Sequence, residues 1–240
     1  MTNKISFNYS PNFNPIKRKL KDLRFIILHY TGMKNDKESI KRLTDIESSV
    51  SCHYYIDKNG KIVSMVPDLY IAWHAGKSKW KKEESLNKNS IGIEISNPGH
   101  DHGYKKFTKK QIKSLKKIIQ FLKKKYKINL KNILGHSDIA PTRKKDPGEK
   151  FPWKDLSKQK LCLWHTLKKN ELIKYRKKKI NLIKQKLFFK NLTNIGYDTT
   201  NCYKKKGYII RAFQRRFRPE LISSYIDEES YLISKNLISQ

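Results

Sequence analysis

The feature that most constrains the fold of this chain is a short apolar run, FIILHY, at residues 25–30. A run of this length that is rich in aliphatic and aromatic residues is typical of a buried strand. In a second run, IGIEIS at residues 91–96, the three isoleucines alternate with other residues and share one face of a strand. Glu94 lies on the opposite face, where its side chain can point toward a cleft rather than into the core.

Two helices are predicted from the spacing of apolar residues, one over residues 37–48 and a longer one from Thr108 to about Lys125. Thr108 and Gln111 form a capping-box pattern, which marks the start of the longer helix. Its apolar residues recur on a single stripe, and the lysines between them form a solvated face. The stripe consists of Ile112, Leu115, Ile119 and Leu122.

A hairpin is predicted where Asn59-Gly60 separates two β-rich segments, residues 53–57 and 61–66. Strands that alternate with helices along the chain indicate an α/β fold. We therefore expect one domain over residues 1–160, built as a mixed central β-sheet flanked by helices.

Beyond residue 160 the chain changes character. Residues 161–183 are predicted to form a basic connector, and residues 184–240 a second small unit. In that unit Ile209, Phe213 and Phe217 recur every four residues, which predicts an amphipathic helix that is stopped at Pro219.

The formal net charge of +33 allows two interpretations. One is a polyanionic partner such as nucleic acid, an anionic membrane or an acidic wall polymer. The other is a compositional bias, since Lys, Ile and Asn are abundant throughout. The basic residues are spread along the chain, which favours the bias. Residues 168–190 are the most basic stretch, but no nucleic-acid reading motif accompanies them, so no specific nucleic acid partner is expected.

Compartment and redox signals are few. Cys52, Cys162 and Cys202 form neither a disulfide framework nor a C-x-x-C zinc pattern. No run of 18 apolar residues occurs, so no transmembrane segment is expected. The N-terminal residues lack the apolar core of a secretory signal, which predicts a cytoplasmic location, with the periplasm or cell envelope as the alternative. The sequence gives no indication of oligomeric state.

Two histidines and an aspartate are placed so that they can converge. His29 and His136 both lie at the ends of predicted core strands. Asp146 follows in a loop and precedes Pro147, a position biased toward extended backbone. Two imidazoles and a carboxylate are a catalytic zinc set, whose fourth position is left to a water with a pKa of about 7. The positions of His29 and His136 at strand ends are also compatible with histidines that only stabilise the fold.

The segment GHSDIAPTRKKDPGEKFPW, residues 135–153, resembles the signature of the amidase type 2 family. This family includes bacterial N-acetylmuramoyl-L-alanine amidases and animal peptidoglycan recognition proteins. FIILHYTGM, SCHYYIDKNGKI, AWHAGKSKW and NSIGIEISNPG match its other blocks in order, and the resemblance covers about residues 9–156. IGYD and IIRAFQRRFRP further resemble a small three-helix peptidoglycan-binding domain, so residues 184–240 are expected to be all-α.

The resemblance implies a metal and a set of ligands. His29, His136 and Asp146 match the zinc ligands of the family, which implies one Zn²⁺ per chain. Asp138 is a rival ligand by chemistry, but it matches a non-ligand position and is expected to have a supporting or structural role.

The resemblance also implies catalytic residues. Glu94 matches the catalytic carboxylate, although a strand residue of this kind could equally be a surface glutamate. Lys144 matches a lysine whose charge stabilises the oxyanion. Arg143 and Lys145 are equally basic neighbours, and only the register against His136 selects Lys144.

Trp73 and His74 lie in a block that borders the substrate groove in relatives, which makes them candidate substrate-binding residues. A core tryptophan beside a hydrogen-bonded histidine is an equal alternative.

The implied reaction is hydrolysis of the amide between N-acetylmuramic acid and L-alanine in peptidoglycan or muropeptides, during cell-wall turnover or recycling. The sequence leaves open whether the sugar can also be the 1,6-anhydro form. One alternative is a peptidoglycan-binding protein without catalysis, against which the intact ligand set argues. The other is a basic nucleic-acid-binding protein, against which the missing reading motif argues.

Overall fold

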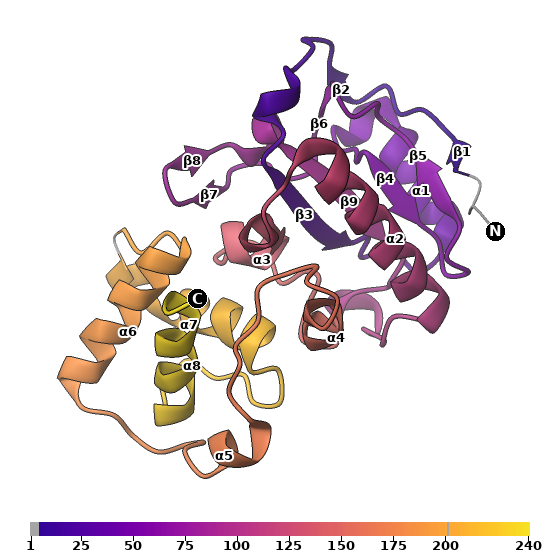
Figure 1. Ribbon diagram of the computed structural model, residues 1–240. Coiled ribbons are helices and arrows are strands. Elements are labelled where there is room, and N and C mark those ends of the chain that lie inside the picture. Colours follow the sequence, from indigo (N-terminus) through magenta and orange to yellow (C-terminus); the bar gives the residue numbers. More distant parts are fainter. Residues whose placement is uncertain (1–4, 201) are drawn as a thin grey trace.

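A six-stranded sheet forms the centre of the computed structural model, which describes residues 5–200 and 202–240 (Figure 1). Strands β4 and β5 pair antiparallel, and the other neighbours in this sheet pair parallel, so the expected mixed sheet is confirmed. In spatial order the strands are β1 (Ser6–Phe7), β5 (Ile62–Ser64), β4 (Tyr54–Ile56), β9 (Ser90–Ile95), β3 (Phe25–Tyr30) and β10 (Ile133–Gly135).

The register of the two middle strands decides which side chains meet. Strands β3 and β9 run parallel, and His29 lies directly opposite Glu94. The isoleucines of β9 are buried in one apolar cluster with Ile26 and Leu28 of β3. Glu94 and His29 therefore share the other face of the sheet, as the alternation in the sequence predicts.

Two helices lie on opposite faces of the sheet. Helix α2 (Lys109–Tyr126) starts at the predicted capping box of Thr108 and Gln111 and buries its apolar stripe against the isoleucine face. Helix α1 (Asp36–Thr44) is capped by Asn35, and its Leu43 packs in a separate cluster with residues of β4 and β5. Helix α1 thus flanks the face that carries His29 and Glu94.

Short elements complete the chain. Two-stranded ribbons are formed by β2 (Phe13–Asn14) with β6 (Ile71–Ala72) and by β7 (Lys79–Trp80) with β8 (Glu83–Glu84). The remaining helices are α3 (His136–Ile139), α4 (Trp153–Ser157), α5 (Lys169–Ile173), α6 (Leu182–Ile195), α7 (Cys202–Phe217) and α8 (Glu228–Ile238).

Helix α7 connects the last three helices to the rest of the fold, since Arg216 of α7 donates to the Ile133 carbonyl of β10. Phe213 and Phe217 of α7 belong to one apolar cluster with Phe25 and Ile27 of β3 and with residues of α6 and α8. Helix α7 ends two residues before the proline that the sequence predicted as its stop. The division of the chain at residues 160 and 184 into domains stays a prediction.

A buried ion pair joins α7 to the turn after β10. The Asp138 carboxylate accepts hydrogen bonds from Arg216 Nη1 at 2.5 Å, Tyr197 Oη at 2.6 Å and the Gly135 amide at 2.8 Å. Arg216 also donates to the Ile133 carbonyl at 3.0 Å. Both side chains of the pair are almost fully buried. This is the structural role expected for Asp138.

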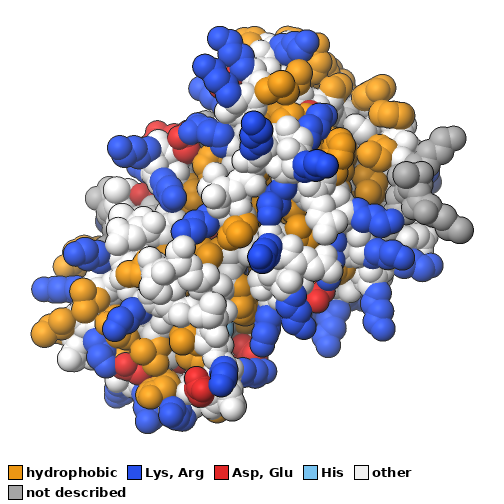
Figure 2. All heavy atoms as spheres, viewed as in Figure 1, with side chains coloured by type: hydrophobic (Ala, Val, Ile, Leu, Met, Phe, Trp, Pro, Cys, Tyr) orange, Lys and Arg blue, Asp and Glu red, His pale blue; other side chains and the backbone are white. Residues whose placement is uncertain are grey.

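The surface of the molecule is basic on the side shown in Figure 2, where Lys and Arg side chains are spread over the whole face rather than gathered in one patch. Every helix among residues 5–200 and 202–240 is too short or too polar to span a bilayer.

Breaking the buried pair should destabilise the fold. We expect Arg216→Met to lower the free energy of unfolding by about 3–5 kcal/mol, because it leaves the Asp138 charge buried without its partner. Arg24→Met breaks the exposed pair with Glu83 and should cost at most about 1 kcal/mol. Urea unfolding measures both. Adding Asp138→Asn to Arg216→Met should recover part of the loss, and a loss below 1 kcal/mol for Arg216→Met alone would contradict the assignment.

Candidate metal centre and active site

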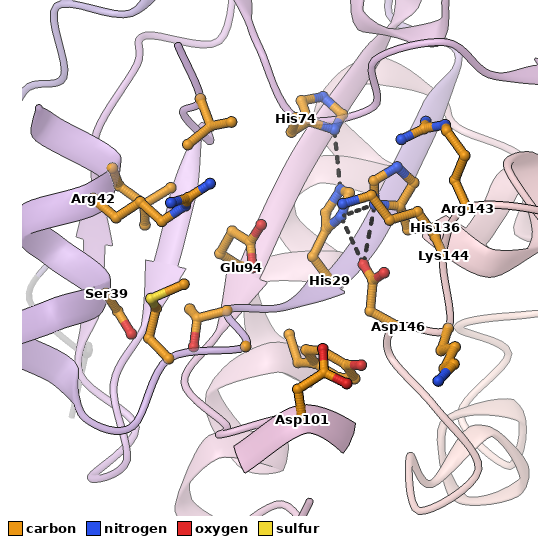
Figure 3. A pocket seen from close by; sticks show the side chains of 17 residues that line it. His29, Ser39, Arg42, His74, Glu94, Asp101, His136, Arg143, Lys144 and Asp146 are labelled. Carbon is orange, nitrogen blue, oxygen red and sulfur yellow. Dashed lines mark hydrogen bonds and ion pairs between the residues drawn. The ribbon is translucent and has the colours of Figure 1, made fainter. Parts of the chain in front are cut away.

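A cavity of about 430 Å³ lies at the carboxyl ends of β3 and β9. His29, Glu94, His136 and Asp146 all line it and converge there in Figure 3. His29 comes from β3, Glu94 from β9, His136 from the start of α3 and Asp146 from the loop that follows α3. The cavity therefore brings together the four residues that the sequence placed in a metal and acid–base site, together with Lys144.

Three potential ligand atoms meet within this cavity. His29 Nδ1 lies 2.9 Å from His136 Nδ1 and 3.0 Å from Asp146 Oδ2, and His136 Nδ1 lies 3.1 Å from the same carboxylate oxygen. All three residues are buried. Three ligands of a tetrahedral ion with bonds of about 2.0–2.1 Å lie about 3.3 Å apart, so the group is close to the size such an ion needs.

The backbone fixes the tautomer of His136. Its Nε2 lies 3.1 Å from the Ala75 carbonyl oxygen, which can only accept a hydrogen bond. The Nε2 atom of the neutral ring must therefore carry the proton. The Nδ1 atom is left with an electron pair that points at the other two ligand atoms.

A relay of hydrogen bonds fixes the tautomer of His29. Ser90 Oγ donates to the Leu86 carbonyl at 2.6 Å, so it can only accept from His74 Nε2 at 3.2 Å. His74 Nδ1 is then the acceptor for His29 Nε2 at 3.0 Å. His29 Nδ1 consequently has no proton, and it too presents an electron pair to the site.

The protonation states fit a metal site. Burial, together with the charge of His136, lowers the pKa of His29 to about 4, and burial lowers the pKa of His74 well below its usual value. Burial alone would raise the pKa of Asp146, but its contacts with His136 and His29 outweigh that effect and hold the pKa well below the usual range. A neutral imidazole and an ionised carboxylate are the donor forms that a metal ion requires.

The missing side chain of Gly92 in β9 makes room for the His74 ring, which lies just after β6. A side chain at Gly92 would bring its Cβ to 2.3 Å from the His74 ring, so only glycine lets that ring lie against β9. The sequence block around His74 thus contributes a residue that orients the His29 ring. A direct contact of His74 with substrate stays a prediction, as does the contact predicted for Trp73.

Trp73 differs from its neighbour. His74 lines the cavity, but Trp73 is not among the residues that line it, and 36% of its surface is exposed. The alternative of a core tryptophan is therefore wrong, whereas the hydrogen-bonded histidine of that alternative is confirmed.

Glu94 is a partly buried residue that lines the cavity. Its side chain points into the cavity, and its Oε2 atom is buried without a hydrogen-bond partner among the described residues (Figure 3). Burial and the charge of Asp146 raise its pKa to about 8, although Lys144 and Arg42 oppose the shift. A carboxyl with a pKa near neutral can both accept and release a proton.

The three consecutive basic residues after Thr142 differ in what they contact. Arg143 Nη2 donates to the carbonyls of Ala75 at 3.0 Å and Lys77 at 2.6 Å, which braces the loop beside His74. Lys144 and Lys145 line the cavity without such a brace. The Arg143 side chain is thus held by backbone carbonyls, and the catalytic role of Lys144 stays a prediction.

Sequence reasoning missed Arg42 and Asp101, which also line the cavity. Arg42 comes from α1, and its place on a predicted helix gave no sign that it faces a cleft. Asp101 lies in a short 3-10 helix after β9, between two histidines that the sequence offered no reason to connect with the site.

Comparisons with known proteins agree on one family. A family model described as N-acetylmuramoyl-L-alanine amidase matches residues 19–149. The chain is 32% identical over 232 residues to the N-acetylmuramoyl-L-alanine amidase AmiD of Escherichia coli, a match that covers 91% of this chain and 83% of AmiD.

Solved structures of such proteins are similar over nearly the whole chain. The complex of E. coli AmiD with the substrate anhydro-N-acetylmuramic acid-L-Ala-D-γ-Glu-L-Lys has a TM-score of 0.79 at 30% identity and covers 94% of this chain and 91% of AmiD. AMPDH3 from Pseudomonas aeruginosa in complex with anhydromuramic pentapeptide has a TM-score of 0.77 at 30% identity and covers 98% of both chains. The similarity therefore includes the C-terminal helices.

The relay predicts that His74 controls metal affinity. We expect His74→Ala to weaken metal binding by about 10- to 100-fold, because His29 loses the partner that fixes its tautomer. His74→Gln supplies a carbonyl oxygen to the same proton and should restore most of the affinity. Competition with a coloured chelator measures it, with the exposed His102→Ala as the control. Unchanged affinity in a folded His74→Ala protein would refute the relay.

The raised pKa of Glu94 predicts a pH-dependent cost in stability. The folded protein holds this proton up to about pH 8, whereas the unfolded chain loses it near pH 4.5, so stability falls as pH rises between these values. At pH 9, Glu94→Gln should stabilise the metal-free protein by about 1–3 kcal/mol. At pH 4 the difference should vanish. Urea unfolding at both pH values checks this, with the exposed Glu47→Gln as control.

Proposed function

The chain belongs to the N-acetylmuramoyl-L-alanine amidase family, and we propose that it hydrolyses the amide between N-acetylmuramic acid and L-alanine. The observation that carries this proposal is one cavity in which three electron-pair donors meet beside a carboxyl with a raised pKa. Donors of this kind suit a metal-assisted hydrolase, and the carboxyl suits proton transfer to and from an amide.

We propose that the metal is Zn²⁺, one per chain, held by His29, His136 and Asp146. The donor set of two imidazoles and a carboxylate supports this choice. When bound, zinc supplies Lewis acidity, which polarises the amide carbonyl and makes hydroxide available near neutral pH.

We assign Glu94 as the general base and then the general acid. Its unpartnered Oε2 atom would take a proton from the attacking water and pass it to the nitrogen of L-alanine as the amide bond breaks. The products are the lactyl carboxylate of the sugar and the free amino group of the peptide. Lys144 would stabilise the negative charge that forms on the carbonyl oxygen during the attack.

The substrates bound in the two similar structures support a muropeptide substrate, in which the sugar is in the 1,6-anhydro form. We propose that this chain cleaves such fragments and peptidoglycan itself, in cell-wall turnover or recycling. A binding protein without catalysis is less well supported, because the ligand atoms, Glu94 and Lys144 are all present in one cavity.

We further propose that residues 184–240 form a unit that binds peptidoglycan, joined by the connector 161–183 to the amidase domain of residues 1–160. Three helices in the last part of the chain, and its coverage by the similar structures, support this proposal. The location of the reaction in the cytoplasm or the cell envelope stays a prediction that fractionation of the native protein would decide.

The assignments predict distinct losses of turnover. A chelator should stop release of peptide from N-acetylmuramoyl-L-Ala-D-γ-Glu-L-Lys, and added Zn²⁺ should restore it. Glu94→Gln and Lys144→Ala should each lower kcat roughly a hundredfold or more while the metal stays bound. Lys145→Ala is the matched control and should change kcat little. Chromatography of the released peptide measures the rates, and full activity after complete metal removal would overturn the proposal.

A further inference from the structure

Arg42 lines the cavity from the side opposite the proposed metal ligands. It projects from α1 toward Glu94, which lies between it and the histidine group (Figure 3). Its side chain is exposed, and its guanidinium makes no hydrogen bond or ion pair with any residue in 5–200 or 202–240. The other three cations that line the cavity, Arg143, Lys144 and Lys145, follow one another on the opposite wall.

The wall around Arg42 is otherwise without charge. Met33, Ser39, Leu43 and Val50 line this side of the cavity. The Arg42 guanidinium is not paired within the described part of the protein and lies beside an uncharged wall. Such a group is suited to bind a planar anion of the substrate, for example a carboxylate.

The chemistry of the substrate indicates which part carries that anion. The lactyl carboxyl group of the muramoyl sugar is consumed in the amide that is cleaved, so the sugar has no ionised group. A γ-linked glutamate, in contrast, is joined to the next residue through its side chain and keeps its α-carboxylate free. This carboxylate lies on the second residue of the peptide and is the one nearest to the cleaved amide, because the C-terminal carboxylate of the L-Lys lies one residue further away.

We propose that Arg42 binds the α-carboxylate of the γ-linked glutamate, and that α1 forms the wall for the stem peptide. This inference rests on the proposed function, since it places the peptide of that substrate in the cavity. It makes Arg42 a specificity residue that distinguishes a free α-carboxylate from an α-carboxamide. A guanidinium can bind a carboxylate through two parallel hydrogen bonds, whereas a carboxamide offers it one oxygen and no charge.

The test compares two substrates that differ in one group. They are N-acetylmuramoyl-L-Ala-D-γ-Glu-L-Lys and the same compound with an α-carboxamide on the glutamate. The zinc-loaded full-length protein should show a KM for the carboxamide that is roughly tenfold or more above that for the acid. In Arg42→Ala the KM for the acid should rise to that of the carboxamide, with kcat almost unchanged. Arg42→Lys should keep part of the preference.

Lys41→Ala is the matched control, because it removes the same charge from the neighbouring exposed position of α1. It should leave both KM values as they are, which separates local binding from a general effect of charge. Circular dichroism of each variant verifies that the fold is intact.

Three results would overturn the inference. The wild-type protein could cleave both substrates with equal KM. Lys145→Ala could abolish the preference while Arg42→Ala does not, which would place the carboxylate on the other wall. Arg42→Ala could slow both substrates equally and shift the pH profile of kcat, which would mean that Arg42 acts through Glu94. Failure of the wild-type protein to cleave either substrate would instead overturn the proposed function, and this inference with it.

Discussion

Three electron pairs with no proton between them meet at the carboxyl ends of the central strands. They belong to the Nδ1 atoms of His29 and His136, which lie 2.9 Å apart, and to Asp146 Oδ2, which lies 3.0 and 3.1 Å from them. Buried acceptors at this separation repel one another unless a cation lies among them. The surrounding structure must hold them in place against that repulsion, and this requirement explains much of the packing around the cavity.

Two buried networks hold the histidines from behind. One is the relay through His74, which fixes the ring of His29. The other begins at Asp138, which accepts a hydrogen bond from the amide of Gly135, the residue before His136. Asp138 is also paired with Arg216 of α7. Helix α7 therefore stabilises the turn that carries His136. The core that α7 shares with β3 has the same effect, because it fixes the helix against the sheet.

The sequence predicted those parts of the fold and site that depend on local pattern. Alternation in β9 placed Glu94 opposite the isoleucines, and the predicted strand ends placed His29 and His136 near each other. The role of His74 could not be predicted in this way, because the relay exists only where Gly92 leaves space between two segments. Arg42 was missed for a similar reason. A helical pattern defines a polar face, but tertiary packing decides whether that face borders water or a cavity.

In the proposed mechanism, the metal and Glu94 are coupled through the register of the sheet. Glu94 lies directly opposite His29 on the neighbouring strand, so a cation held by the ligand group lies close to its carboxyl. A nearby positive charge favours the ionised form and lowers a pKa that burial has raised to about 8. Without the ion, much of Glu94 is protonated at neutral pH and cannot accept a proton from water. Under the proposed function, loss of the metal would therefore remove both the Lewis acid and the ionised form of Glu94, and metal binding would restore the two together.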